Sequence, residues 1–184
     1  SPALACNALP LGLLRRALGD FEEPSNGSSP RGFEPGSVGA TVTHHQTQKR
    51  GSRPEDCEDA SCFDTDHGVF VMCDGASSGI YCTRWASLLS ESYTRLRLDC
   101  SKEQDVRNWL QGCLDAWLAA IDWTELTEVR ANKIERTGAA ATFLGLRLGT
   151  RPSEQDPPVE YLWQAHAVGD TCLFHWRDGR VLAT

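Results

Sequence analysis

The chain of 184 residues contains no run of about 18 apolar residues, the length that a membrane-spanning helix needs. Its N-terminus also lacks the cationic start and the small-residue cleavage site of a secretory signal peptide. No long basic run is present, and the 18 Lys and Arg residues are outnumbered by 25 Asp and Glu residues. We therefore expect a cytoplasmic protein with neither membrane nor nucleic acid as a partner.

The two-residue spacing of a zinc clip is missing as well, because no two of the eight cysteines are separated by just two residues. We expect reduced thiols, most of them buried as small hydrophobic side chains. The hydrophobic share of 40% and the chain length together predict one globular domain with a proper core.

The first 37 residues differ in composition from the rest of the chain. An apolar patch around Leu9 to Leu18 precedes a stretch rich in Pro, Ser and Gly. The patch has the composition of a docked helix, but Pro10 and Gly12 interrupt its helical period. We prefer a flexible or weakly docked leader over residues 1–37, with the domain itself over residues 38–184.

Within residues 38–184, β-type runs are followed by helical patterns and then by further β-type runs. This order predicts an α+β sandwich rather than alternating βαβ units. Two helices are expected between 79 and 121, and a third at 125–136 capped by Thr124. Strands are expected at 38–43, 60–63, 69–73, 140–148, 159–167, 171–176 and from Val181, with an exposed loop at 151–158 and a hairpin turn at Asp178-Gly179.

The apolar run 69–73 ends in Asp74-Gly75, and the acidic pair Glu58-Asp59 precedes the run 60–63. An isolated Asp-Gly is most often only a turn. Here, however, the carboxylates stand at the ends of two strands expected to be neighbours, and without a cation they would repel one another. A Gly also lets its own carbonyl approach a cation closely. Oxygen-only ligands favour Mg²⁺ or Mn²⁺.

Neighbouring residues of a regular strand point to opposite faces of the sheet. Glu58 and Asp59 therefore cannot both be direct ligands of one ion. One of the two is expected to ligate, and the other to act through water or through a ligand.

Four short motifs resemble those of the type 2C (PPM-type) metal-dependent protein Ser/Thr phosphatases, especially the bacterial branch. The similarity covers about residues 38–184, and its specificity comes from the order and spacing of the motifs. The motifs are Cys57-Glu58-Asp59-Ala60, Asp74-Gly75-Ala76-Ser77-Ser78-Gly79, Gly138-Ala139-Ala140-Ala141-Thr142 and Val168-Gly169-Asp170-Thr171.

The resemblance implies an α-β-β-α sandwich of two packed sheets flanked by antiparallel helix pairs, incomplete at the C-terminus. It also implies two Mn²⁺ or Mg²⁺ ions, and possibly a third. Asp74 would bridge the two ions, the carbonyl of Gly75 and Glu58 or Asp59 would complete one of them, and Asp170 would approach the third. We favour Glu58 as the direct ligand and Asp59 as the residue that holds a water.

By this resemblance, a water activated by the metal ions hydrolyses phosphoserine or phosphothreonine in proteins, so the partners are a phosphorylated protein and a cognate Ser/Thr kinase. No covalent phosphoenzyme is needed. Where many animal members have a candidate general acid, His, this chain has Ala76. Pro54 occupies the usual position of the phosphate-binding Arg, which leaves Arg53 or Lys49 for that role.

Two other functions compete with the phosphatase. The family's remaining metal aspartates would follow Thr184, so the chain as given is expected to lack a complete binuclear site. An inactive regulatory or binding module of the same fold is therefore one alternative, and Ala76 also favours it. An unrelated α+β protein with a structural cation is the other. The isolated histidines, among them His67 and His166, are expected to be structural.

Overall fold

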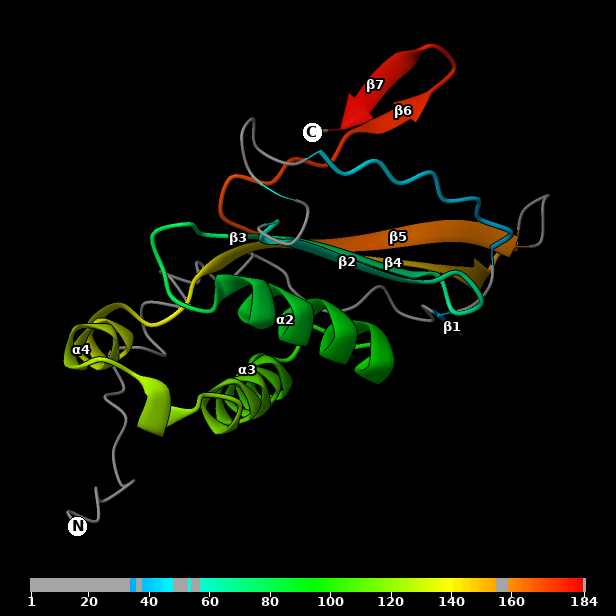
Figure 1. The fold of residues 1–184 in the computed structure, drawn as a ribbon. Coiled ribbons are helices and arrows are strands. Elements are labelled where there is room, and N and C mark those ends of the chain that lie inside the picture. Colours follow the sequence, from blue (N-terminus) through cyan, green and yellow to red (C-terminus); the bar gives the residue numbers. More distant parts are fainter. Residues whose placement is uncertain (1–33, 36–37, 48–52, 54–56, 155–158, 184) are drawn as a thin grey trace.

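The computed structural model describes residues 34–35, 38–47, 53, 57–154 and 159–183. The fold is mixed α+β, as expected, and Figure 1 shows the sheet above two of the helices. The strands are β1 (Glu34–Pro35), β2 (Asp59–Asp64), β3 (Val69–Gly75), β4 (Ala141–Pro152), β5 (Val159–Val168), β6 (His175–Arg177) and β7 (Arg180–Ala183). The helices are α2 (Cys82–Leu96), α3 (Glu103–Ala119), the short 3₁₀ turn η2 (Trp123–Glu125) and α4 (Glu128–Thr137). None of the helices in the described ranges has the length and apolar character needed to span a bilayer.

Five strands form one antiparallel sheet in the order β1-β4-β3-β2, with β5 also paired to β4. β2 and β3 form a hairpin whose turn is held by Asp64, because its carboxylate lies 2.8 Å from His67 Nδ1. The His67 amide also donates to the Asp64 carbonyl at 3.3 Å. His67 is therefore a structural turn residue, as the sequence predicted.

Helices α2 and α3 cover one face of the sheet (Figure 1). Trp85 near the start of α2 meets Trp117 near the end of α3, with ring centroids 6.5 Å apart. Tyr93 near the end of α2 meets Trp109 in the first half of α3 at 5.8 Å. The two helices are therefore antiparallel, which confirms the predicted pair.

The core lies between these helices and the sheet. Val69, Val71 and Cys73 alternate along β3 and are buried toward the helices. Phe143 of β4 completes the layer, because its ring packs edge-on against Tyr93 with centroids 5.2 Å apart. Such an aromatic arrangement contributes about 1 kcal/mol beyond the area that it buries.

The other face of the sheet carries apolar side chains that are partly open to solvent. Met72 of β3 is 47% exposed and Trp163 of β5 is 43% exposed. Residues 38–47 pass over this face, where the ring of His44 lies 5.4 Å from that of Phe63, and the hairpin of β6 and β7 stands on the same side (Figure 1).

The strand predicted at 38–43 is wrong, because these residues have no regular secondary structure. Gly39 has a φ of 67°, a left-handed conformation that interrupts an extended run. The predicted strands at 60–63 and 69–73 are confirmed within β2 and β3.

The predicted cap of the third helix is also wrong. Thr127 caps α4, because its hydroxyl oxygen accepts a hydrogen bond from the amide of Arg130 at 3.4 Å. Thr124 instead belongs to η2, where its amide and its hydroxyl both donate to the carboxylate of Asp122. Thr124 therefore stabilises the turn before α4 and does not cap the helix.

The C-terminal strands differ from the prediction in their ends. β4 continues through Pro152 into the predicted loop, and of the predicted strand 171–176 only the end is present, as part of β6. The expected Asp-Gly turn is confirmed: Asp178 and Gly179 have φ values of 53° and 77°, as a tight hairpin requires.

Little of the predicted leader lies within the described residues. Its residues 34–35 form β1, which pairs with Thr150 and Gly149 of β4, while 1–33 and 36–37 lie outside the description. The seven described cysteines are free thiols, but only Cys73, Cys82 and Cys113 are buried, so burial is less general than expected.

Candidate functional site

Asp59 and Asp74 are direct partners in the antiparallel pairing of β2 with β3. Directly opposed residues project to the same face of a sheet, with Cβ atoms about 5 Å apart. Asp59 is half-buried and Asp74 is exposed, on the face opposite to α2 and α3. The structure therefore places two carboxylates side by side at one end of the sheet.

Thr142 extends this row onto the next strand. It is the partner of Asp74 in β4, and its Oγ1 lies 3.3 Å from the Asp74 amide nitrogen, which donates to it. Gly169 follows β5 at the same end, where an added Cβ would lie 2.9 Å from the Thr142 methyl group. Asp170 comes next in the chain. All four motifs of the sequence thus meet on four neighbouring strand ends.

Glu58 lies beside this row but is directed elsewhere. Its carboxylate accepts a hydrogen bond from Ser77 Oγ at 2.5 Å, and its carbonyl accepts one from the Gly75 amide at 3.1 Å. Glu58 lies just before β2, which begins at Asp59, and its carboxylate contacts Ser77. Asp59, the residue expected to hold a water, is the one that stands opposite Asp74.

Gly75 is required by the close approach of two backbone segments. A Cβ at this position would lie 2.8 Å from the Glu58 carbonyl oxygen and 3.1 Å from the backbone carbonyl of Cys82. Both contacts are with backbone atoms, which cannot shift far to make room for a side chain. The tight packing brings the end of β3 against the start of α2.

Cys73, next to Asp74 in the chain, takes no part in chemistry on the open face. Its side chain points into the core, and burial raises the pKa of its thiol to about 12. At neutral pH the thiol is therefore protonated, which excludes Cys73 as a thiolate nucleophile.

The oxygen atoms of this row are suitable ligands for a hard divalent cation, but the row contains few of them. Asp59 and Asp74 supply carboxylate oxygens, which Mg²⁺ and Mn²⁺ prefer. Among the described residues, no group of three or more His, Cys, Asp or Glu side chains is placed to hold a metal ion. Glu58 and Asp170 lie at the same end of the sheet without forming such a group with the aspartate pair.

The other residues singled out in the sequence are Arg53, Lys49, Ala76 and His166. Arg53 is exposed, and Lys49, the other predicted contact of the phosphate, lies outside the described residues. Ala76 donates its amide to the Ala140 carbonyl at 2.9 Å, which ties the loop after β3 to the start of β4. His166 belongs to β5 and shares with Gly145 the sheet face that the helices cover. Burial lowers the pKa of its imidazole, although Asp99 opposes this shift.

Sequence reasoning assigned no role to three residues that contact the acidic pair or its neighbours. Ser77 holds the Glu58 carboxylate, Thr142 binds the Asp74 amide, and Gln46 donates to the Asp59 carbonyl at 3.3 Å. Ser77 and Thr142 lie within two of the four motifs, so the sequence pattern already contained them. Nothing in the sequence near Gln46 indicates its contact.

Comparisons of the chain with protein-family models, with curated proteins and with solved structures give no match in any of the three.

Proposed function

We propose that the chain is a metal-dependent protein Ser/Thr phosphatase, which hydrolyses phosphoserine and phosphothreonine in cytoplasmic proteins. One observation carries the proposal: motifs far apart in the sequence meet at one end of the sheet, where Asp59 stands opposite Asp74 and Asp74 binds Thr142. Acidic side chains that repel one another are kept together when a cation between them is part of the function.

In this proposal Asp59 and Asp74 hold Mg²⁺ or Mn²⁺, with the carbonyl of Gly75 as a further oxygen donor. A cation bound there would acidify a water for attack on phosphorus and neutralise the phosphate charge. Thr142 fixes the backbone of Asp74 through its amide, and Ser77 fixes the carboxylate of Glu58. Preorganised ligands of this kind lose little entropy on binding the ion.

Other residues complete the proposed chemistry. Asp170, beyond Thr142 in the row, is the expected ligand of a further, looser ion. Ala76 has no group that can donate a proton, so the leaving serine or threonine oxygen takes its proton from water. Arg53 or Lys49 is the proposed contact of the phosphate.

The sandwich of two sheets flanked by helix pairs also belongs to the proposal. The open face of the sheet supports it, because Met72 and Trp163 are 47% and 43% exposed there, together with Tyr161 at 69%. Exposed apolar side chains on one face of a sheet are typical of a layer that another layer covers.

The test is phosphate release from a phosphothreonine peptide, measured with and without Mn²⁺ for the chain and two variants. Asp74→Asn removes one proposed ligand, and Asp66→Asn removes the same charge from the exposed turn at the other end of the hairpin. We expect Mn²⁺-dependent release that Asp74→Asn reduces at least tenfold and Asp66→Asn leaves unchanged. Equal activity in the three proteins would overturn the proposal.

An inactive module of the same fold is the second candidate. The absence of a third acidic ligand beside Asp59 and Asp74 among the described residues favours it. Mn²⁺ binding that Asp74→Asn abolishes, without phosphate release from the unmodified chain, would support this candidate over the enzyme.

A further inference from the structure

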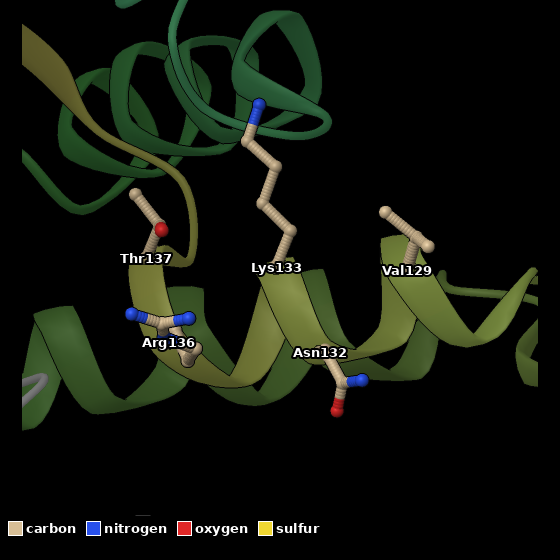
Figure 2. A pocket seen from close by; sticks show the side chains of 5 residues that line it. All are labelled: Val129, Asn132, Lys133, Arg136 and Thr137. Carbon is tan, nitrogen blue, oxygen red and sulfur yellow. The ribbon is translucent and has the colours of Figure 1, made fainter.

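A groove runs along α4, outside the row of strand ends. It has a volume of about 780 Å³ and is lined by Val129, Asn132, Lys133, Arg136 and Thr137. These positions follow the spacing of one helical face, so the lining is a continuous strip of α4. In Figure 2, Lys133 extends from the helix toward the neighbouring ribbons, whereas Asn132 points to the other side.

The lining is cationic in a chain whose formal charge is -7. Lys133 and Arg136 supply two positive charges, and no carboxylate belongs to the strip. Within the described residues neither cation has a carboxylate within ion-pair distance, whereas Arg97 and Arg151 are paired with Asp64 and Glu160. Cations that form no ion pair within a groove are open to an anionic partner.

An apolar side chain lies at one end of the same strip. Val129 is 78% exposed, more than any other large hydrophobic side chain among the described residues. It stands one helical turn before Lys133 and about two turns before Arg136. A partner that fits this strip therefore carries an apolar residue next to acidic residues, which is the chemistry of a polypeptide segment rather than of a free anion.

A short segment joins the end of α4 to the strand end beside the acidic pair. α4 ends at Thr137, and the next residue, Gly138, accepts a hydrogen bond from the Ile80 amide at 3.4 Å through its carbonyl. Thr142, which binds the Asp74 amide, follows Thr137 by five residues, so these two residues are at most about 18 Å apart. An extended segment of about six residues spans that distance.

We propose that the groove along α4 docks an acidic segment of the polypeptide substrate, within about six residues of the phosphorylated serine or threonine. The position of the phosphoresidue rests on the proposed phosphatase function. The binding of an acidic segment to Lys133 and Arg136 is independent of that function and is measured in a separate experiment.

The binding test uses a fluorescent, unphosphorylated peptide that contains a Leu flanked by four Glu residues, and the same peptide with Gln in place of Glu. The groove variant is Lys133→Ala with Arg136→Ala, which keeps good helix formers in α4. The control is Arg177→Ala with Arg180→Ala, which removes the same charge from the exposed hairpin of β6 and β7 on the other side of the sheet (Figure 1).

By fluorescence anisotropy we expect the Glu peptide to bind the unmodified chain and the control equally, and the groove variant about fivefold more weakly. The Gln peptide should bind more weakly to all three proteins, and raising the salt should reduce the preference for Glu. Val129→Ser should weaken binding of the Glu peptide without changing its salt dependence. Equal loss in the groove and control variants, or no preference for Glu, would overturn the docking site.

The second measurement separates this proposal from the phosphatase proposal. Phosphate release is compared between phosphothreonine peptides with and without an acidic segment, placed four residues or twelve residues away. A rate advantage only at the short spacing, lost in the groove variant, supports a groove that selects substrates. If no peptide releases phosphate while the groove still binds the Glu peptide, the enzyme proposal fails and the docking site stands.

Discussion

Asp59 and Asp74 face each other across β2 and β3 as direct partners in the strand pairing. Like charges directly opposed on a sheet cost stability. Each of Asp59→Asn and Asp74→Asn should therefore raise the free energy of unfolding by about 0.5 kcal/mol in EDTA. In Mn²⁺ both variants should lose the stabilisation that the unmodified chain gains, because a cation that binds only the folded state stabilises it.

Thermal unfolding of the chain and of each variant, in EDTA and in millimolar Mn²⁺, measures both effects. Asp66→Asn, in the turn at the other end of the hairpin, is the control and should behave like the unmodified chain. A variant at Asp59 or Asp74 that is less stable in EDTA, yet still stabilised by Mn²⁺, would contradict the paired site.

Gly75→Ala should destabilise the fold by about 2 kcal/mol, because its Cβ would lie 2.8 Å from the Glu58 carbonyl oxygen. Gly112→Ala is the matched control, since a Cβ there meets nothing within 4 Å and Gly112 lies in the interior of α3. This control should stabilise the chain by up to about 1 kcal/mol. Urea unfolding measures both changes, and effects of the same sign would contradict the close approach.

His166 should make stability fall as the pH falls below 6.5, the ordinary pKa of His. Burial lowers its pKa in the folded chain, so between the two pKa values the unfolded chain binds a proton that the folded chain does not. Asp99 and Arg147 face the ring and act in opposite directions, with Asp99 favouring the charged form. His166→Gln should flatten the pH dependence of urea unfolding between pH 7.5 and 5.5; an unchanged slope would refute the assignment.

Thr127→Ala should cost about 1 kcal/mol, because it removes the side-chain cap of α4. Hydrogen exchange of the Arg130 amide, which donates to Thr127, should become faster in this variant. Thr127→Ser keeps the hydroxyl and should restore protection. Thr124→Ala should leave the Arg130 amide protected, and an equal effect of the two alanine variants would contradict the cap.

The sequence predicted the elements whose pattern is local. Alternating burial along β3 and the helical spacing of Trp109, Cys113 and Trp117 in α3 both follow from side chains that face one core. Asp74 was found for the same reason, since a charged residue directly after such a strand stands out. The Asp-Gly turn between β6 and β7 was also predictable, because few residues adopt its backbone conformation.

The rest depended on contacts between distant segments. Whether Glu58 or Asp59 stands opposite Asp74 depends on the register of two strands, and no pattern within residues 57–60 determines it. Residues 38–43 do not form the predicted strand because Gly39 has a positive φ and other segments form the edges of the sheet. The groove along α4 depends on how the side chains of one helical face are arranged in space, which helical spacing alone does not determine.

The turn held by Asp64 and His67 helps to set the strand register that places the acidic pair at the far end of the hairpin. The side chains of a strand alternate between its faces, so one residue inserted between Asp64 and Val69 would shift β2 by one position against β3. Asp59 would then leave its place opposite Asp74, and an adjacent residue, Glu58 or Ala60, would take it. The length of the turn between β2 and β3 therefore helps to determine which residues form the candidate site, although the turn lies at the other end of the hairpin.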